Sequence, residues 1–160
     1  MSDSSAKRAP FVVEWREGFR INIPQIDGEH KHLFALVKQV ELATVKQTVD
    51  ELLDYVVTHF TNEQKLMEDS RYPAFAEHLK LHEEFAASVA DFLGSGDEWD
   101  EGRVQDLRRF LNKWLIGHIM THDLRFGNWY RDHHDEPPPE VAPQVEIKKA
   151  GWLARLFGRG

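Results

Sequence analysis

The sequence predicts an all-α protein, an up-down-up-down bundle of four amphipathic helices with an N-terminal arm and a flexible amphipathic C-terminal tail. Two observations favour this fold class. Apolar residues recur at spacings of three and four over four long stretches, which is the period of one face of an α-helix. Short polar connections separate these stretches, so that consecutive helices would run antiparallel. A chain of 160 residues is long enough for one domain with a buried core.

The N-terminal part of the chain lacks this periodicity. Residues 1–10 are polar and are expected to be disordered. Residues 11–26 contain scattered aromatic side chains, and we expect an arm without regular structure that packs Phe11, Trp15 and Phe19 on the body.

The first two helices are expected on either side of a short connection. The first is predicted over about residues 28–44, with Asp27 as its N-cap. The second is predicted to start at Thr48, because Thr48 and Glu51 have the spacing of a capping box, and to end near Ser70.

The third and fourth helices are separated by an acidic loop. The third is predicted to begin near Pro73, since proline is favoured in a first turn, and to end at Gly94. Residues 94–102 form the loop, whose carboxylates suit the positive end of the next helix dipole. The fourth helix is predicted to run past His122. The bundle domain as a whole is expected over residues 11–132.

The C-terminal residues differ from the rest in composition. Residues 133–144 contain PPPEVAP and are expected to form a stiff linker. Residues 145–160 place Trp, Leu and Phe on one helical face among several cations, which predicts an amphipathic cationic peptide. Such a peptide can lie on an anionic membrane surface, dock on a protein partner or fold back on the bundle, and composition does not separate these three.

Composition excludes several classes of protein. The chain has no cysteine, which excludes thiolate zinc sites, iron–sulfur clusters and disulfides. A net charge of −7 argues against nucleic acid as a partner. The sequence shows no secretory signal and no apolar run long enough to span a membrane, so we expect a cytoplasmic protein, with a peripheral position at the inner face of the membrane as the alternative.

Histidine and carboxylate side chains recur on the predicted core faces. His59 and Glu63 are spaced i,i+4, as are His78 and His82, which stacks each pair on one face of its helix. Buried imidazoles and carboxylates are costly unless something binds them. Each remaining helix adds donors, which brings the set to seven: His30, His59, Glu63, His78, His82, His118 and Asp123.

The donor types and their number indicate two transition-metal ions. A mixture of imidazoles and carboxylates favours iron, zinc, copper or manganese over calcium or magnesium. Seven donors are too many for one such ion, whereas two ions that share carboxylates use them all. A lone histidine in a core is usually structural, and we assign His32, His133 and His134 no role in metal binding.

The motifs that carry these residues resemble those of the hemerythrin family, and more closely its bacterial single-domain members. The resemblance covers about residues 11–132. The matching stretches are IDGEHK (26–31), HFTNE (59–63), YP (72–73), HLKLHEEF (78–85) and WLIGHIMTHD (114–123).

The resemblance implies a non-haem diiron centre with an oxo or hydroxo bridge, which binds dioxygen reversibly at an open position on one iron. It divides the ligands as follows: His78, His82 and His118 on one iron, His30 and His59 on the other, and Glu63 and Asp123 bridging both.

The spacing of His118 and Asp123 departs from simple helical periodicity. An i,i+5 pair lies about 140° apart around an ideal α-helix, so His122 is the better-placed partner of His118 by geometry alone. The resemblance instead assigns the role to Asp123. A local distortion of the helix would reconcile the two.

Four apolar residues, Phe60, Phe85, Trp114 and Leu115, match positions that line the oxygen pocket in the family, although they would also serve as ordinary core. No spare acid or base is evident beside them, which favours an oxygen carrier, store or delivery protein over an enzyme. An oxygen or redox sensor, and a diiron enzyme of peroxidase or ferroxidase type, remain open alternatives.

Overall fold

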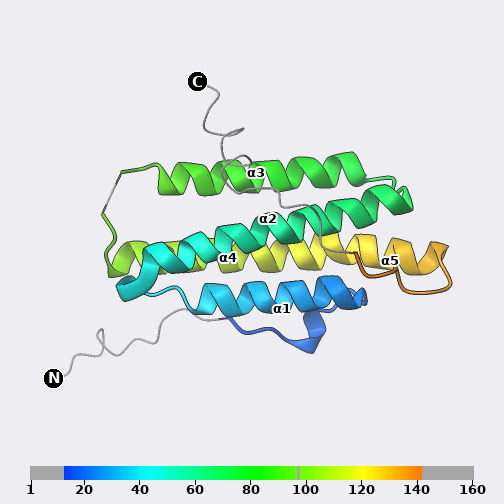
Figure 1. The fold of residues 1–160 in the computed structure, drawn as a ribbon, viewed down its shortest axis with the longest axis horizontal. Helices are drawn as coiled ribbons and strands as arrows, with labels where there is room; N and C mark the ends of the chain where they lie inside the picture. The colour runs from blue at the N-terminus through cyan, green and yellow to red at the C-terminus, as the bar shows by residue number, and fades with distance from the viewer. Residues whose placement is uncertain (1–12, 97, 142–160) are drawn as a thin grey trace.

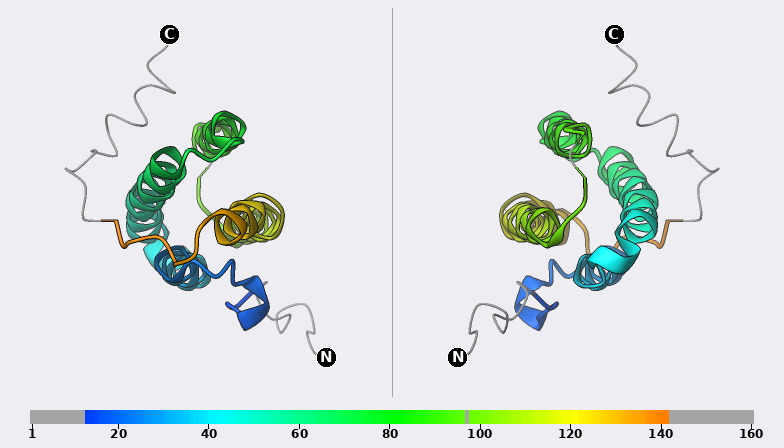
Figure 2. Two further views of the ribbon diagram at one scale, coloured as in Figure 1. Left: turned by 90° about the vertical axis from the view of Figure 1, so that its right-hand side faces the viewer. Right: turned by 90° about the vertical axis from the view of Figure 1, so that its left-hand side faces the viewer.

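The computed structural model describes residues 13–96 and 98–141, and these form the predicted four-helix bundle. The long helices lie side by side in Figure 1 and surround a common interior when viewed end on in Figure 2. Helix α1 packs against α2 and α4, and α2 packs against α3. The helices are α1 (Pro24–Lys38), α2 (Val45–Ser70), α3 (Phe75–Leu93), α4 (Glu101–His118) and α5 (Leu124–His133).

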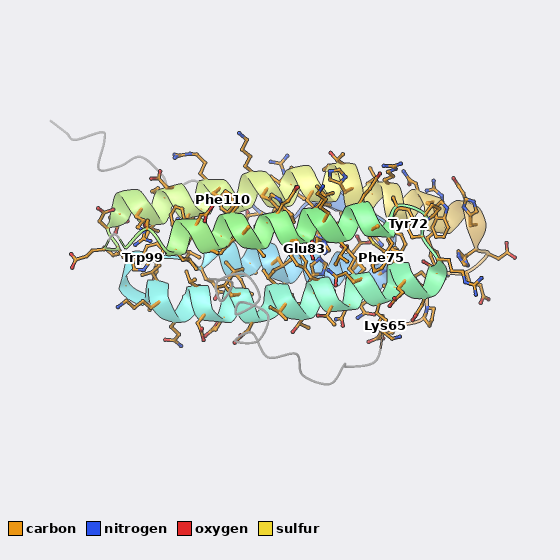
Figure 3. All side chains as sticks on the ribbon, turned by 90° about the horizontal axis from the view of Figure 1, so that it is seen from above. Lys65, Tyr72, Phe75, Glu83, Trp99 and Phe110 are labelled. Carbon is orange, nitrogen blue, oxygen red and sulfur yellow. The ribbon has the colours of Figure 1, made fainter. Side chains whose placement is uncertain are left out.

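Helices α4 and α5 form one nearly continuous rod, because a π-helical turn at Ile119–Asp123 joins them. Two short 3-10 segments precede α1 and α2, at Glu17–Phe19 and Leu42–Thr44. In Figure 3, Tyr72 lies near one end of the bundle, between α2 and α3, and Trp99 lies near the other end, in the loop before α4. None of the helices in the described part of the chain is long and apolar enough to cross a membrane.

The apolar face of each helix is directed inward, as the periodicity predicted. Leu33, Phe34 and Val37 of α1 are all buried, and so are most of the periodic apolar residues of α2 and α4, although Phe110 and Trp114 are only partly buried. These side chains form one connected core that reaches Tyr72 at the α2–α3 end of the bundle, where the centroid of the Tyr72 ring lies 4.9 Å from that of Phe126. Burial of this apolar surface is the main stabilising contribution to the fold.

The predicted boundaries of the first helix are wrong at both ends. Helix α1 begins at Pro24, with proline in its first turn, and ends at Lys38. Asp27 therefore lies inside the helix, and its carboxylate accepts hydrogen bonds from the backbone N–H groups of Ile21 (2.8 Å) and Asn22 (3.1 Å). Asp27 caps the arm, not the helix.

The predicted capping box of the second helix is also wrong. Helix α2 starts at Val45, so Thr48 lies within its first turn and is buried. The third helix begins at Phe75, two residues after Pro73, and Gly94 is its C-cap, as predicted. Asp100 is the N-cap of α4 and accepts a hydrogen bond from the Arg103 backbone N–H at 2.8 Å.

The N-terminal arm packs on the bundle through its aromatic residues. Trp15 stacks on Phe19, and Phe19 stacks on Phe34 of α1 with 5.2 Å between ring centroids. The arm is not wholly irregular, since it contains a 3-10 turn. Phe11, the N-terminal residues 1–10 and the cationic peptide 145–160 lie outside the described residues.

Candidate metal centre

Three imidazoles from two helices converge on one point inside the bundle. The Nε2 atom of His118 lies 3.2 Å from the Nε2 atoms of both His78 and His82. Glu63 Oε1 lies 2.8 Å from the Nε2 atom of His78, and Asp123 Oδ1 lies 3.0 Å from that same atom. Five donor atoms from these five residues thus lie within 4.8 Å of one another, and all five residues are buried.

The spacing of these donors matches a coordination shell. Two ligands at right angles, each about 2.1 Å from a shared ion, lie about 3.0 Å apart. Three imidazole nitrogens that face one another cannot all be paired as hydrogen-bond donors and acceptors, because each neutral ring carries one N–H group. A cation at their centre would use the lone pair of each.

The second group of donors contains two imidazoles. His30 Nε2 lies 3.0 Å from Asp123 Oδ2, and His59 Nε2 lies 4.0 Å from Glu63 Oε2. These four side chains also bring one donor atom each within 4.8 Å of the others. Glu63 and Asp123 belong to both groups, with each carboxylate presenting one oxygen to each side. The structure therefore brings together all seven residues that the sequence singled out.

Several of these buried polar atoms lack hydrogen-bond partners among the described residues. They include both ring nitrogens of His30, one oxygen of Glu63 and both oxygens of Asp123. A buried polar group without a partner costs about 1–3 kcal/mol. Five such atoms at one place are expected where side chains are arranged to coordinate cations. A set of imidazole and carboxylate donors suits iron, zinc, copper or manganese.

The π-helical turn solves the spacing problem at Asp123. In this turn the backbone hydrogen bonds run from i to i+5, so residues five apart share a face. His118 and Asp123 consequently both point inward, with 3.1 Å between His118 Nε2 and Asp123 Oδ1. His122 is only half-buried and belongs to neither donor group; its ring centroid lies 5.4 Å from that of His118.

A second layer of polar side chains holds the histidines from behind. Glu29 Oε1 accepts a hydrogen bond from His59 Nδ1 at 2.8 Å, and Asn62 donates to the other oxygen of Glu29. The side-chain amide of Gln64 lies 3.0 Å from His82 Nδ1. Such contacts fix the ring orientation and strengthen the imidazole as a ligand.

Sequence reasoning gave these second-layer residues no role. Glu29 directly precedes His30 in the IDGEHK motif, which was the only available signal. Which histidine it contacts depends on how α1 and α2 are rotated against each other, and periodicity does not specify that angle.

The donor residues affect one another's protonation strongly. Burial opposes charge on His78, but the close carboxylates of Asp123 and Glu63 outweigh burial and raise the pKa of His78 to about 10. Burial lowers the pKa of His82 to about 4. Burial and the charge of Asp123 act to raise the pKa of Glu63, yet contacts with His78 and His82 hold it below its usual range. Without metal, the raised pKa of His78 therefore favours its protonated form at neutral pH, and the lowered pKa of His82 favours its neutral form.

An apolar cavity adjoins the two-histidine group. It offers about 20 Å³ of space for the centre of a water-sized molecule, which is room for about one small molecule. Its polar end is formed by His30 and His59 of this group, together with Asp123, which both groups share, and His118 of the other group. The apolar lining includes all four residues predicted for the pocket, and the ring of Phe60 also stacks on His82 at 3.7 Å between centroids. The apolar lining residues are Leu33, Val37, Leu52, Val56, Phe60, Phe85, Leu111, Trp114 and Leu115.

The remaining histidines lie away from the donor groups. His32 packs its ring against Tyr55, with 4.3 Å between centroids. His133 and His134 are exposed and stack on Trp129 and Tyr130. None of the three belongs to a group of potential metal donors among the described residues.

Residues 22–130 match the family model of the hemerythrin HHE cation binding domain. The chain belongs to the hemerythrin family. It is 29% identical to a bacteriohemerythrin of Stenotrophomonas maltophilia, in an alignment that covers 92% of this chain and 97% of the relative. It is 35% identical to a hemerythrin of Themiste dyscrita, over 70% of this chain and 88% of the relative. A crystal structure of wild-type hemerythrin superposes with a TM-score of 0.65 at 28% identity, covering 74% of this chain and 97% of that one.

Membership of this family places the chain among proteins of the non-haem iron, dioxygen-binding type. Hemerythrins are oxygen-binding proteins and not enzymes, which agrees with the preference drawn from the sequence. The predicted likeness to bacterial members is also confirmed, since several bacterial relatives align over most of this chain.

Proposed function

We propose that the chain holds two iron ions and binds dioxygen reversibly, as an oxygen carrier, store or delivery protein. The observation that carries this proposal is the pair of donor groups that share Glu63 and Asp123 but differ by one imidazole. The proposed ligands are His78, His82 and His118 for one ion, His30 and His59 for the other, and Glu63 and Asp123 for both.

The unequal donor sets assign different tasks to the two positions. Three imidazoles and two carboxylate oxygens leave the first position little room for another ligand. Two imidazoles with two carboxylate oxygens leave the second position short of a full shell, which is typical of a reactive site. Bound iron would supply the reversible one-electron chemistry that dioxygen requires.

The residues around the second position control what reaches it. The cavity beside His30 and His59 is lined mainly by aliphatic and aromatic side chains, among them Phe60, Trp114 and Leu115. An apolar lining excludes water and limits proton entry, which would protect a loaded site from irreversible oxidation of its iron with loss of the oxygen as a reduced product. We propose this cavity as the oxygen pocket.

The test is the response of the full chain, loaded with iron and reduced without air, to repeated cycles of oxygen and inert gas. A visible absorption band that appears with oxygen and disappears on its removal, over several cycles, supports reversible binding. Steady consumption of added reductant would indicate an oxidase or peroxidase instead, and no uptake of oxygen would refute the proposal. A Leu115→Ala variant, which widens the cavity, should lose the band to irreversible oxidation sooner than the unaltered chain.

A further inference from the structure

An unbroken series of hydrogen bonds leads from the segment after α5 to His59. The backbone N–H of Val141 donates to Gln25 Oε1 at 2.7 Å. Gln25 Nε2 in turn donates to Glu29 Oε2 at 3.0 Å, and Asn62 donates to the same oxygen at 2.8 Å. Glu29 Oε1 accepts the hydrogen bond from His59 Nδ1 at 2.8 Å. The series spans 116 residues of sequence between its first two members.

The path of the chain makes this contact possible. Figure 1 shows the segment after α5, in orange, turning back along the bundle, and Figure 2 shows it crossing toward α1. Val141 is partly buried and packs against the core. The segment is therefore seated on the body of the protein, and Gln25 is the side chain of α1 that receives it.

The middle of the series is enclosed, so a change at one end affects the other. The side chain of Glu29 is 10% exposed and that of His59 is 2% exposed. The buried Glu29 carboxylate depends on few donors, because an unpaired buried charge is costly, and without Gln25 its Oε2 atom would keep only the Asn62 donor. Gln25 holds Glu29 and Val141 at once, through the two ends of a single amide group. Displacement of Val141 would free the oxygen of this amide, so that Gln25 could turn away and weaken its hold on Glu29 behind His59.

We propose that this link couples the seating of the C-terminal segment at Val141 to the strength with which the two-histidine position holds its metal. The proposal rests on the function proposed above and adds a regulatory input to it. The three-histidine position provides an internal comparison. The partner of His82 is Gln64 on α2, and among the described residues no hydrogen bond connects Gln64 to the C-terminal segment. The effect should therefore be confined to the ion at the two-histidine position.

Two pairs of variants separate the link from general damage. Val141→Pro removes the N–H donor and keeps an apolar side chain, while Val141→Ala keeps the donor and shortens the side chain. Gln25→Met removes both bonds of the amide. Gln47→Met is its control, because Gln47 is exposed on α2 and its amide donates a hydrogen bond to Glu51 on the same helix.

The first measurement is the rate at which a chelator removes iron from the full, loaded chain. We expect a slow and a fast phase. Val141→Pro should accelerate the phase in which the two-histidine position loses its iron about fivefold, and Gln25→Met should accelerate it about tenfold. The phase of the three-histidine position should stay unchanged. Val141→Ala and Gln47→Met should behave as the unaltered chain does. Equal rates for Val141→Pro and Val141→Ala, together with an unaffected Gln25→Met, would overturn the proposal.

The second measurement follows the Val141 amide itself, by hydrogen exchange. Coupling between two sites is reciprocal, so metal loading should slow exchange at Val141 about fivefold. In the metal-free chain, Glu29→Ala should accelerate the same exchange while Gln47→Met leaves it unchanged. An amide that responds to neither change would refute the link. A chain that takes up no iron, but whose Val141 amide responds to Glu29→Ala, would refute the proposed function and leave the link standing.

Discussion

At the scale of single residues, Glu63 and Asp123 are the side chains that connect the two donor groups. Both are fully enclosed, at 0% and 1% exposure, and each offers one oxygen to either side. Two carboxylates this deep in a bundle would be highly unfavourable without cations to neutralise them. The metal proposal therefore predicts different outcomes for changes at these carboxylates and at exposed ones.

Glu63→Gln keeps the size of the side chain and removes its charge. We expect the affinity for both ions to fall at least tenfold, because the oxygen that each group shares becomes a neutral and weaker ligand. Metal content after dialysis against a weak chelator measures this. Glu68→Gln, on the exposed face of the same helix, should retain the full metal content. Equal metal content in the two variants would contradict the assignment.

Gly127 is required for the close approach of the N-terminal arm to α5. A Cβ atom at this position would collide with the backbone oxygen of Ile21. Since backbone cannot move away as a side chain can, Gly127→Ala should lower the free energy of unfolding by about 1–3 kcal/mol. Gly117→Ala is the control, because no atom lies within 4 Å of its added Cβ and alanine favours the helix.

Urea unfolding of the two glycine variants checks this prediction. Gly117→Ala should raise the free energy of unfolding by about 0.5–1 kcal/mol, while Gly127→Ala lowers it. A Gly127→Ala protein as stable as the unaltered chain would mean that the arm does not contact α5 at Ile21.

At the scale of elements, the π-helical turn at Ile119–Asp123 decides which residue faces the metal centre. In a regular α-helix, His122 would share a face with His118. The extra residue in the turn places Asp123 there and leaves His122 on the side of the bundle. A sequence with this spacing predicts either outcome, and only the resemblance to a family favoured the distorted turn.

This arrangement predicts opposite results for two adjacent alanine substitutions. Asp123→Ala should abolish binding of at least one metal ion, since it removes a donor from both groups. His122→Ala should keep two ions per chain. Elemental analysis of the purified variants measures the difference, and loss of metal from His122→Ala with retention in Asp123→Ala would show that the turn is a regular α-helix in solution.

Periodicity predicted the existence and inward faces of the helices better than their ends. The apolar stripes of the four long helices follow from local spacing alone, because burial of one face is the same requirement at every turn. Asp27 was wrongly predicted as the N-cap of the first helix, because the amides that it accepts hydrogen bonds from, those of Ile21 and Asn22, lie in an arm with no periodic signal. Thr48 was predicted as a cap because its spacing to Glu51 matches a capping box, but Thr44 and Gln47 have the same spacing and Thr44 is the N-cap of α2.

At the scale of the whole molecule, contacts between helices were the part that sequence did not supply. Each inward donor except Asp123 could be predicted from the periodicity of its own helix. The pairs Glu29–His59 and Val141–Gln25 depend on how helices rotate and slide against one another, and on where the chain returns after α5. The proposed metal ligands could be predicted because seven donors gather at one centre, whereas each contact behind them involves a single pair of residues.

The protonation network predicts a pH dependence for the stability of the metal-free chain. His78 has a raised pKa, so its contribution is complete below the ordinary value of about 6.5 and is lost as pH rises toward about 10. His82 has a lowered pKa, so stability is lost as pH falls from about 6.5 through about 4. The lowered pKa values of Glu63 and Asp123 act in the same acid direction.

Urea unfolding of the metal-free chain from pH 4 to pH 10 should therefore give the highest free energy of unfolding near about pH 6.5. Metal binding requires a neutral His78, so the alkaline loss that His78 causes should disappear in the loaded chain. A metal-free chain whose stability does not change between neutral and alkaline pH would show that His78 carries no proton in the cluster.

The central claim is that seven side chains hold two ions unequally, and the most direct test is a crystal structure of the iron-loaded chain with anomalous scattering recorded at the iron edge. The account predicts two iron peaks inside the bundle. One should be bound by His78, His82 and His118, the other by His30 and His59, with Glu63 and Asp123 between them. A single peak, or a pair in which either iron lies away from these residues, would contradict it.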